Sequence, residues 1–413
     1  MCGLAGLYYP RGGSATDELD APVRRMCARM HARGPDADGF FVDAAAGIGL
    51  GHRRLSILDL DARANQPMAS ADGRYLMVYN GEIYNFRELR EQAQRDGIAF
   101  RTLSDTEVLL ELFARDGEAV LARLRGMFAL AIWDRHARRV FLARDPYGIK
   151  PLYVARCDRG WLFASQVKGL LASGLVSSHP DAVGQAGFWM LGSVPEPRTW
   201  FRDISLLPAG HCTWITADGM QPSRSYWDIA QAWRDAGPDR VDDDDARRIA
   251  RDALRASIRA HLVSDVPVGV FLSGGIDSGS LAALMKEAGV DGLQGVTIAF
   301  DEFSGTHDDE VPVAAGLASR YGIAHHVRRI GHEEFQRDLP RILDAMDQPS
   351  VDGINSWYAS KAVSELGLKV VVSGVGGDEL FQGYSSFSEL PRLVRRWRAA
   401  SALPGVRAAA RAA

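Results

Sequence analysis

The sequence predicts an α+β domain of two sheets with flanking helices, followed by an α/β domain on a parallel sheet. Up to about residue 165, short apolar runs alternate with Gly, Asp or Pro, as in antiparallel strands. From residue 266, near-continuous apolar runs of strand length alternate with helical segments, which is typical of a parallel sheet covered on both faces.

The first part is read element by element from its apolar pattern. Helices are expected at 21–33 and 105–124, the second with Asp105 as its N-cap. Residues 207–228 predict a closing hairpin, and 228–241 a polar linker. The expected strands are 3–9, 40–43, 47–59, 74–85, 128–134, 139–145, 151–156 and 161–165.

The second part opens with a helix at 242–262, whose first turn is acidic and whose later residues are basic, so its charges complement the helix dipole. The end, 389–413, reads as an amphipathic stub with an arginine face. The expected strands are 266–272, 292–300, 324–330 and 368–374, and the expected helices are 278–289, 311–322, 332–347 and 355–367.

Composition bounds the function. The chain has 413 residues, enough for two to three domains, and a net charge of -4, which gives no electrostatic case for nucleic acid or an anionic membrane. With no stretch of membrane-spanning length and no basic-then-apolar leader, we expect a cytoplasmic protein. The four cysteines are scattered, which argues against zinc or a disulfide framework.

Only Cys2 has an unusual position. After removal of Met1 it would carry a free α-amine, which titrates near ~8 and can accept the thiol proton. One residue would then supply both nucleophile and base. The alternative is that Cys2 is an early core residue.

Five further motifs occur in one order: RGPD at 33–36, HRRLSI at 52–57, NGEIYN at 80–85, SDTEV at 104–108 and RDPYGIKPLY at 144–153. With Cys2 they resemble the glutaminase domain of class II glutamine amidotransferases. The resemblance implies an N-terminal nucleophile αββα sandwich. It also implies that Cys2 attacks glutamine, releases ammonia through a thioester and yields glutamate.

The resemblance also implies residue roles. Arg54 would pair with the glutamine carboxylate, and a guanidinium suits that bidentate contact. Asn80 and the Gly81 N–H would form the oxyanion hole, while Glu82 and Asp105 would hold the substrate ammonium. Structural alternatives are a hairpin turn at Asn80-Gly81 and a helix cap at Asp105.

A second motif, FLSGGIDSGS at 271–280, follows an apolar strand and opens a helix. Its glycines and the helix N-terminus make an anion cradle, and it lacks the Gly-Lys-Ser/Thr of a Walker loop. It resembles the pyrophosphate-binding loop of ATP pyrophosphatases; the alternative is a glycine-rich turn without a ligand. By resemblance the ATP-binding residues are Leu272, Ser273, Gly274, Gly275, Asp277, Ser278, Ile298, Ser373 and Gly374, with Asp277 and Asp378 on Mg²⁺.

Together, the two parts resemble the glutamine-hydrolysing asparagine synthetase family. This implies glutamine, ATP and a small carboxylic acid, aspartate first, as substrates, and an acyl-adenylate that ammonia attacks. The expected domains are 2–210 (glutaminase), 211–241 (hairpin and linker) and 242–413 (ATP-binding, incomplete at its C-terminus). No nucleic acid or membrane partner is expected, and a homodimer is left open.

One departure concerns the second glycine-rich loop, VSGVGGDELFQGY at 372–384, where Val375 stands in place of the family's Glu. A valine can neither bind a cation nor take a proton. This leaves open a different acceptor acid, or a glutaminase with a defective synthetase domain. A binding protein that senses ATP or glutamine is a third alternative, against which the thiol nucleophile argues.

Overall fold

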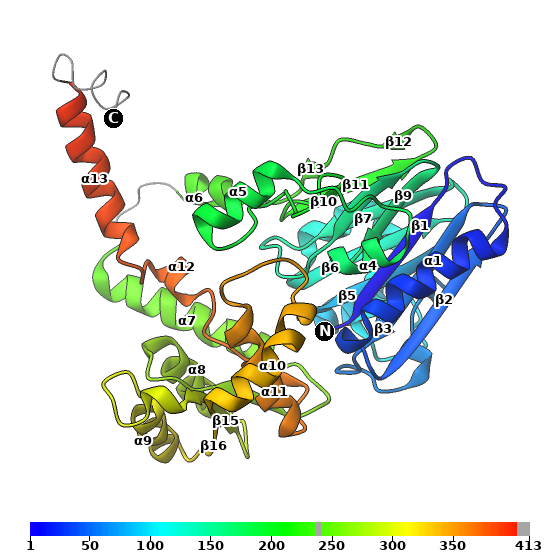
Figure 1. Ribbon diagram of the computed structural model, residues 1–413. Coiled ribbons are helices and arrows are strands. Elements are labelled where there is room, and N and C mark those ends of the chain that lie inside the picture. Colours follow the sequence, from blue (N-terminus) through cyan, green and yellow to red (C-terminus); the bar gives the residue numbers. More distant parts are fainter. Residues whose placement is uncertain (237–240, 403–413) are drawn as a thin grey trace. The chain divides into compact units, whose positions relative to one another are not determined.

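The computed structural model describes residues 1–236 and 241–402 (Figure 1). The chain forms two compact units: Met1–Pro267 with Gly331–Val370, and Val268–Ile330 with the residues from Val371 on. Within the described ranges, no helix has the length and apolar character needed to cross a membrane.

The first unit contains two antiparallel sheets, ordered β10-β8-β9-β1-β3-β2 and β12-β11-β7-β6-β5-β4, with β13 paired to β11. The first sheet consists of β1 Gly3–Tyr8, β2 Ala37–Asp43, β3 Ile48–Arg54, β8 Tyr153–Cys157, β9 Gly160–Ala164 and β10 Ile204–Leu206. The second consists of β4 Met68–Ala69, β5 Tyr75–Ile83, β6 Gly126–Asp134, β7 Arg139–Arg144, β11 His211–Thr216, β12 Gly219–Met220 and β13 Arg224–Ser225.

The two sheets stack through a shared core in which Leu4 and Leu50 of the first meet Val78 and Trp133 of the second. Helices cover the outer faces: α1 and α4 cover the first sheet, and α2 and α3 cover the second. This is the predicted αββα layering (Figure 1). The helices of this unit are α1 Thr16–Arg29, α2 Phe86–Arg95, α3 Asp105–Asp116, α4 Val167–Ala172, α5 Ala182–Leu191, α6 Ile229–Asp235, α7 Asp243–His261, α10 His332–Ala345 and α11 Gly353–Glu365.

Three local predictions differ from the structure. The N-cap of α3 is Ser104, whose side chain accepts from the Glu107 N–H, so the prediction of Asp105 as the cap is wrong. The helix predicted over 105–124 is broken at Gly117, where φ is +62°, and continues as a 3-10 helix over Gly117–Arg123. The strand predicted over 47–59 ends at Arg54.

The predicted hairpin forms the edge of the second sheet, because β11 pairs with both β7 and β12. Of the predicted linker, 229–235 forms α6, and 237–240 lies outside the described residues. The C-terminal stub is helical over α13, Ser386–Ser401, and 403–413 also lies outside the described residues.

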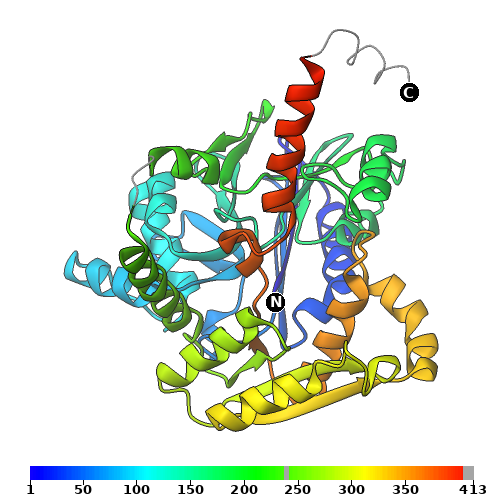
Figure 2. The ribbon, with the colours of Figure 1, turned by 90° about the vertical axis from the view of Figure 1, so that its left-hand side faces the viewer.

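The second unit has the predicted parallel sheet, in the order β16-β15-β14-β17. Helix α8 contacts β14, and α9 contacts β15 and β16, shown in yellow in Figure 2. The strand order reverses between β14 and β17, and ligands of open α/β sheets bind beside such a point. The elements are β14 Val268–Phe271, α8 Ile276–Glu287, β15 Gln294–Phe300, α9 Val311–Tyr321, β16 Ala324–Ile330, β17 Val370–Val372, α12 Gly377–Phe381 and α13.

Candidate functional site

Cys2 is held at the start of β1. The register of β1 with β3 pairs Gly3 with Arg53, which brings Cys2 to the end of β3. There the Leu55 N–H donates to Sγ at 3.4 Å. Arg33, from the RGPD motif, donates through Nε to the Cys2 carbonyl at 2.9 Å. These contacts tie down a terminus that would otherwise fray.

Burial disfavours the charged forms of both the Cys2 thiol and the terminal amine. Burial raises the pKa of the Cys2 thiol, against opposing contributions from the Leu55 N–H and the terminal amine. Burial also lowers the pKa of that amine, here on Met1, to about 5. The Met1 amine is therefore mostly neutral at pH 7. Removal of Met1 would place the amine on Cys2 itself.

Among the residues that the structure describes, Arg54 forms no ion pair. Its guanidinium is 6% exposed and donates to the carbonyls of Leu58, Asp59 and Asp61 and to the side-chain oxygen of Asn65 at 2.7 Å. All four acceptors are neutral. The side chain is thus fixed in place by both of its Nη groups, and a substrate carboxylate would have to compete with these neutral acceptors for the guanidinium N–H groups.

Asn80 and Gly81 lie inside β5, paired with Ala129 and Phe128 of β6, so the hairpin-turn alternative is wrong. Asn80 is 1% exposed, and its Nδ2 has no hydrogen-bond partner among the residues that the structure describes. A buried amide with a spare donor is unusual unless a ligand completes it, which fits the expected oxyanion role. A Cβ at position 81 would lie 2.3 Å from the Met127 carbonyl oxygen, so only glycine fits there.

Two carboxyls lie beside the same strand end. Asp105 is buried and accepts from the Tyr79 hydroxyl and the Ile83 N–H, both at 2.9 Å. Burial raises the pKa of Asp105 and raises that of Glu82 to about 7, where Lys150 opposes the shift. Burial makes the charged form of both carboxyls costly, and a cation beside them, such as a substrate ammonium, would stabilise that form.

The structure brings several sequence-predicted residues of this site close enough to interact electrostatically, since burial raises the pKa of Cys2 and of Glu82, and Arg54 opposes the first shift while Asp105 adds to the second. His52 of β3 also links the two sheets. Its Nε2 lies 2.9 Å from the carbonyl oxygen of Tyr79, which precedes Asn80 in β5. Burial lowers the pKa of His52 to about 4, so it is neutral at pH 7. Lys150 belongs to the RDPYGIKPLY motif, but the sequence predicted no role for it. The residue is 6% exposed, and the Asp145 carboxylate accepts its backbone N–H at 2.9 Å.

The first glycine-rich loop follows β14 and is shaped by its serines. The Ser278 hydroxyl accepts from the Ser273 N–H at 3.1 Å, and the Ser273 hydroxyl accepts from the Gly275 N–H at 3.1 Å. Gly274 and Gly275 are exposed just before the N-terminus of α8, as an anion cradle requires. Beside the loop, Leu272 is buried and Ile298 is half-buried on the adjacent β15.

The second loop, after β17, meets the first through Asp277. A Cβ added at Gly374 would lie 3.1 Å from Asp277 Cβ, and one at Gly377 would lie 2.4 Å from Asp277 Oδ2. Asp277 therefore lies directly beside the loop that carries Asp378. Ser373 and Val375 are exposed in this loop, and Val375 is 90% exposed.

Two carboxylates suit Mg²⁺, which takes its other ligands from phosphate oxygens and water. Within residues 1–236 and 241–402, no cluster of three or more His, Cys, Asp or Glu side chains could hold a metal. The carboxylates of Asp277 and Asp378 fit the role of partial Mg²⁺ ligands, with phosphate oxygens and water as the others. Both residues belong to the second unit.

Two family models match the chain. One, described as a glutamine amidotransferase domain, matches residues 1–227, and the other, described as asparagine synthase, matches residues 250–413.

Curated proteins are similar over nearly the whole chain. It is 35% identical over 394 residues to asparagine synthetase (glutamine-hydrolyzing) 1 of Bacillus subtilis, covering 94% of the chain and 60% of that protein. It is 37% identical over 424 residues to a putative asparagine synthetase of Mycobacterium tuberculosis, covering 96% and 64%. An amidase of Penicillium rubens is 31% identical, covering 94% and 60%. The chain thus spans about three fifths of the length of these relatives.

Among solved structures, a glutamine phosphoribosylpyrophosphate amidotransferase from Bacillus subtilis covers 90% of this chain and 81% of its own, at 18% identity and a TM-score of 0.41.

Proposed function

Because this chain belongs to the glutamine-hydrolysing asparagine synthetase family, we propose that it couples glutamine hydrolysis at Cys2 to ATP-driven amide formation. The observations that carry the glutaminase half are the Cys2 thiol, which is tied down at the end of β3, and the buried Asn80, whose Nδ2 has no partner among the described residues. A site that only senses glutamine needs neither the nucleophile nor the spare donor.

In the proposed first half, the Cys2 sulfur attacks the side-chain amide carbon of glutamine, and the α-amine of Cys2 takes the thiol proton. Asn80 Nδ2 and the Gly81 N–H donate to the tetrahedral oxyanion. The protonated amine returns the proton to the leaving nitrogen, so ammonia departs and a thioester remains. Water then attacks the thioester, the amine accepts its proton, and glutamate is released.

In the proposed second half, the loops at 273–278 and 373–378 bind the phosphates of ATP, and a carboxylate of the acceptor attacks the α-phosphorus. Pyrophosphate leaves, ammonia attacks the acyl-adenylate, and AMP departs. Asp277 and Asp378 would hold Mg²⁺, which neutralises phosphate charge when bound. The adjacency of Asp277 to Gly374 and Gly377 supports this assignment.

Aspartate is the first candidate acceptor, because the relatives include proteins named asparagine synthetase. A different acid is the second candidate. It is favoured by the exposed Val375, in a loop where the resemblance predicts Glu, and by a similar protein named an amidase. ATP and glutamine as substrates suit a cytoplasmic enzyme, and a homodimer stays a prediction.

The test is an acid screen with ATP and glutamine that follows glutamate and pyrophosphate release and identifies the amide by mass spectrometry. Aspartate-dependent pyrophosphate with asparagine formation supports the first candidate. Another acid that gives its amide supports the second. Glutamate release without any acid-dependent pyrophosphate would leave only a glutaminase. Cys2→Ala should lose the glutamine reaction and keep the reaction with free ammonia.

A further inference from the structure

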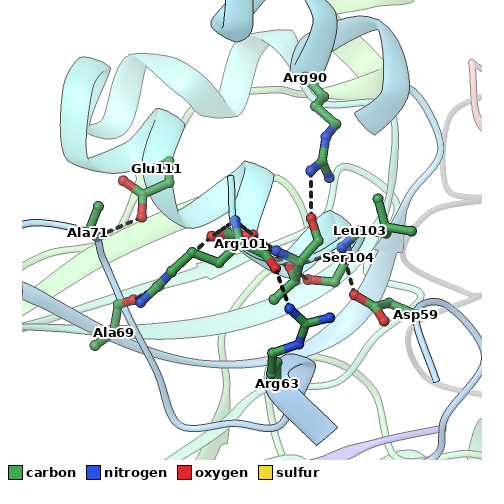
Figure 3. Close-up of polar contacts among 11 residues, drawn as sticks. Asp59, Arg63, Ala69, Ala71, Arg90, Arg101, Leu103, Ser104 and Glu111 are labelled. Atoms are coloured by element: carbon green, nitrogen blue, oxygen red, sulfur yellow. Dashed lines mark hydrogen bonds and ion pairs between the residues drawn. The ribbon is translucent and has the colours of Figure 1, made fainter. Parts of the chain in front are cut away.

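Asp59 joins two loops from different parts of the chain, the loop that follows Arg54 and the loop that precedes Asp105 (Figure 3). Its carboxylate is 9% exposed and accepts from the Leu103 N–H at 2.7 Å and from the Asp61 N–H at 3.2 Å. Leu103 directly precedes Ser104, the N-cap of α3, and α3 begins with Asp105. One side chain thus anchors the segment that delivers Asp105.

The same residue belongs to the loop that holds Arg54. The Asp59 carbonyl accepts from Arg54 Nη2, and the neighbouring carbonyls of Leu58 and Asp61 accept from the same guanidinium at 3.3 and 2.9 Å. Asp59 also has a φ of 49°, a left-handed conformation that turns its backbone toward Arg54. A movement of Asp59 would therefore move the acceptors that position Arg54.

The Asp105 side of this junction is independently fixed. Glu107, 1% exposed, accepts from the Arg101 N–H at 2.9 Å, the Thr102 N–H at 2.6 Å and the Thr102 hydroxyl at 2.7 Å. Although burial alone would raise it, these hydrogen bonds hold the pKa of Glu107 below its usual value. Arg90 donates to the Thr102 carbonyl from the other side (Figure 3). The loop at 101–104 is thus held by several hydrogen bonds, and the Asp59 carboxylate connects it to the loop around Arg54.

Asp265 holds Asp59 in turn. Its Oδ2 accepts from the Asp59 N–H at 2.7 Å, and its own N–H donates to the Ile57 carbonyl at 3.0 Å. The two residues are 206 positions apart in sequence, and Asp265 lies three residues before β14 begins at Val268.

We propose that Asp59 is a positioning residue of the glutamine site, which sets the separation between Arg54 and Asp105, and that Asp265 holds it in that position. The inference rests on the proposed function, in which these two groups bind the carboxylate and the ammonium on one carbon of glutamine. Since that carbon fixes the spacing of the two charges, a small shift between Arg54 and Asp105 weakens binding of the whole amino acid.

The test is Asp59→Asn, which keeps the size of the side chain and tolerates the left-handed backbone but offers one acceptor oxygen where two are used. We expect the KM for glutamine to rise about tenfold, while kcat stays within about twofold. The matched control is Asp43→Asn, because Asp43 also accepts one backbone N–H, from Ala46 at 2.9 Å, in a turn beyond β2. Both kinetic constants should stay unchanged in the control.

A second variant, Asp265→Ala, removes the acceptor of the Asp59 N–H and touches no part of the glutamine site. It should raise the KM for glutamine as well. In the double variant, the increase in KM should be smaller than the two single-variant effects combined, because both act through Asp59. The Kd for glutamine, measured by calorimetry in a Cys2→Ala background, reports binding without turnover and should rise about tenfold with Asp59→Asn.

The outcomes separate this inference from the proposed function. Active wild-type protein with an unchanged Kd and KM in both variants would overturn the inference alone. A fall in the kcat of Asp59→Asn that matches a loss of folded protein in thermal unfolding would also overturn the inference alone. Inactive wild-type protein that binds glutamine, with a tenfold rise in Kd in Asp59→Asn, would reject the proposed function and keep the inference. A wild type that binds no glutamine would overturn both.

Discussion

Truncation of Asn80 should separate catalysis from stability. Its Nδ2 makes no hydrogen bond to any described residue, so Asn80→Ala breaks no described contact of that donor. Loss of one oxyanion donor costs about 2.7–4 kcal/mol of transition-state stabilisation, so kcat should fall about 10²–10³-fold with little change in KM. The assay is glutamate release, with thermal unfolding measured in parallel.

Asn85, in the same NGEIYN motif, is the matched control. Its Nδ2 donates to the Arg123 carbonyl at 3.0 Å, and its Oδ1 accepts from the Arg125 N–H at 2.9 Å. Asn85→Ala should lose about 1–2 kcal/mol of stability and keep kcat. If Asn80→Ala kept kcat within about threefold and lost stability instead, Asn80 would be a structural amide and the oxyanion reasoning would fail.

Three further predictions concern the two sites. Burial raises the pKa of Glu82 to about 7, so its carboxyl is mostly neutral below that pH and charged above it. Because the charged form would attract the substrate ammonium, the KM for glutamine should fall as the pH rises through 7. Glu82→Gln should remove this pH dependence. Gly377→Ala places a Cβ 2.4 Å from Asp277 Oδ2 and should abolish ATP-dependent pyrophosphate release. Gly316→Ala should keep that release, because its Cβ would have no described atom within 4 Å apart from its own helix backbone and chain neighbours. Val375→Glu restores the carboxylate that the resemblance predicts, and since Val375 is 90% exposed the variant should fold normally. It should raise aspartate-dependent pyrophosphate release. An unchanged rate would show that this position has no role in adenylation.

The candidate glutamine site was predicted from motifs that occur in one order along the chain and resemble a glutaminase domain. The roles that this resemblance gives Cys2, Arg54 and Asn80 suit their thiol, guanidinium and amide groups, and they stay predictions. The strand expected over 74–85 is observed as β5, and its pairing with β6 rules out the turn alternative at Asn80-Gly81. Local propensity misled at one point. The apolar run after Arg54 reads as strand, but its carbonyls turn toward the guanidinium.

Contacts between distant segments could not be predicted. Nothing near Asp59 in sequence points to Asp265. Likewise, Asp347 accepts from the Val167 and Lys168 N–H groups at 2.9 and 3.0 Å, which helps to explain why the segment from α10 to α11 groups with the first unit. Such pairings depend on the finished fold, and one sequence carries no signal for them.

The most direct measurement is the mass of the purified protein before and after treatment with an alkylating diazoketone analogue of glutamine, followed by peptide mapping. Our account predicts a chain that starts at Cys2, with one adduct on that residue and none on Cys27, Cys157 or Cys212. A chain that keeps Met1, or an adduct on another cysteine, would contradict it.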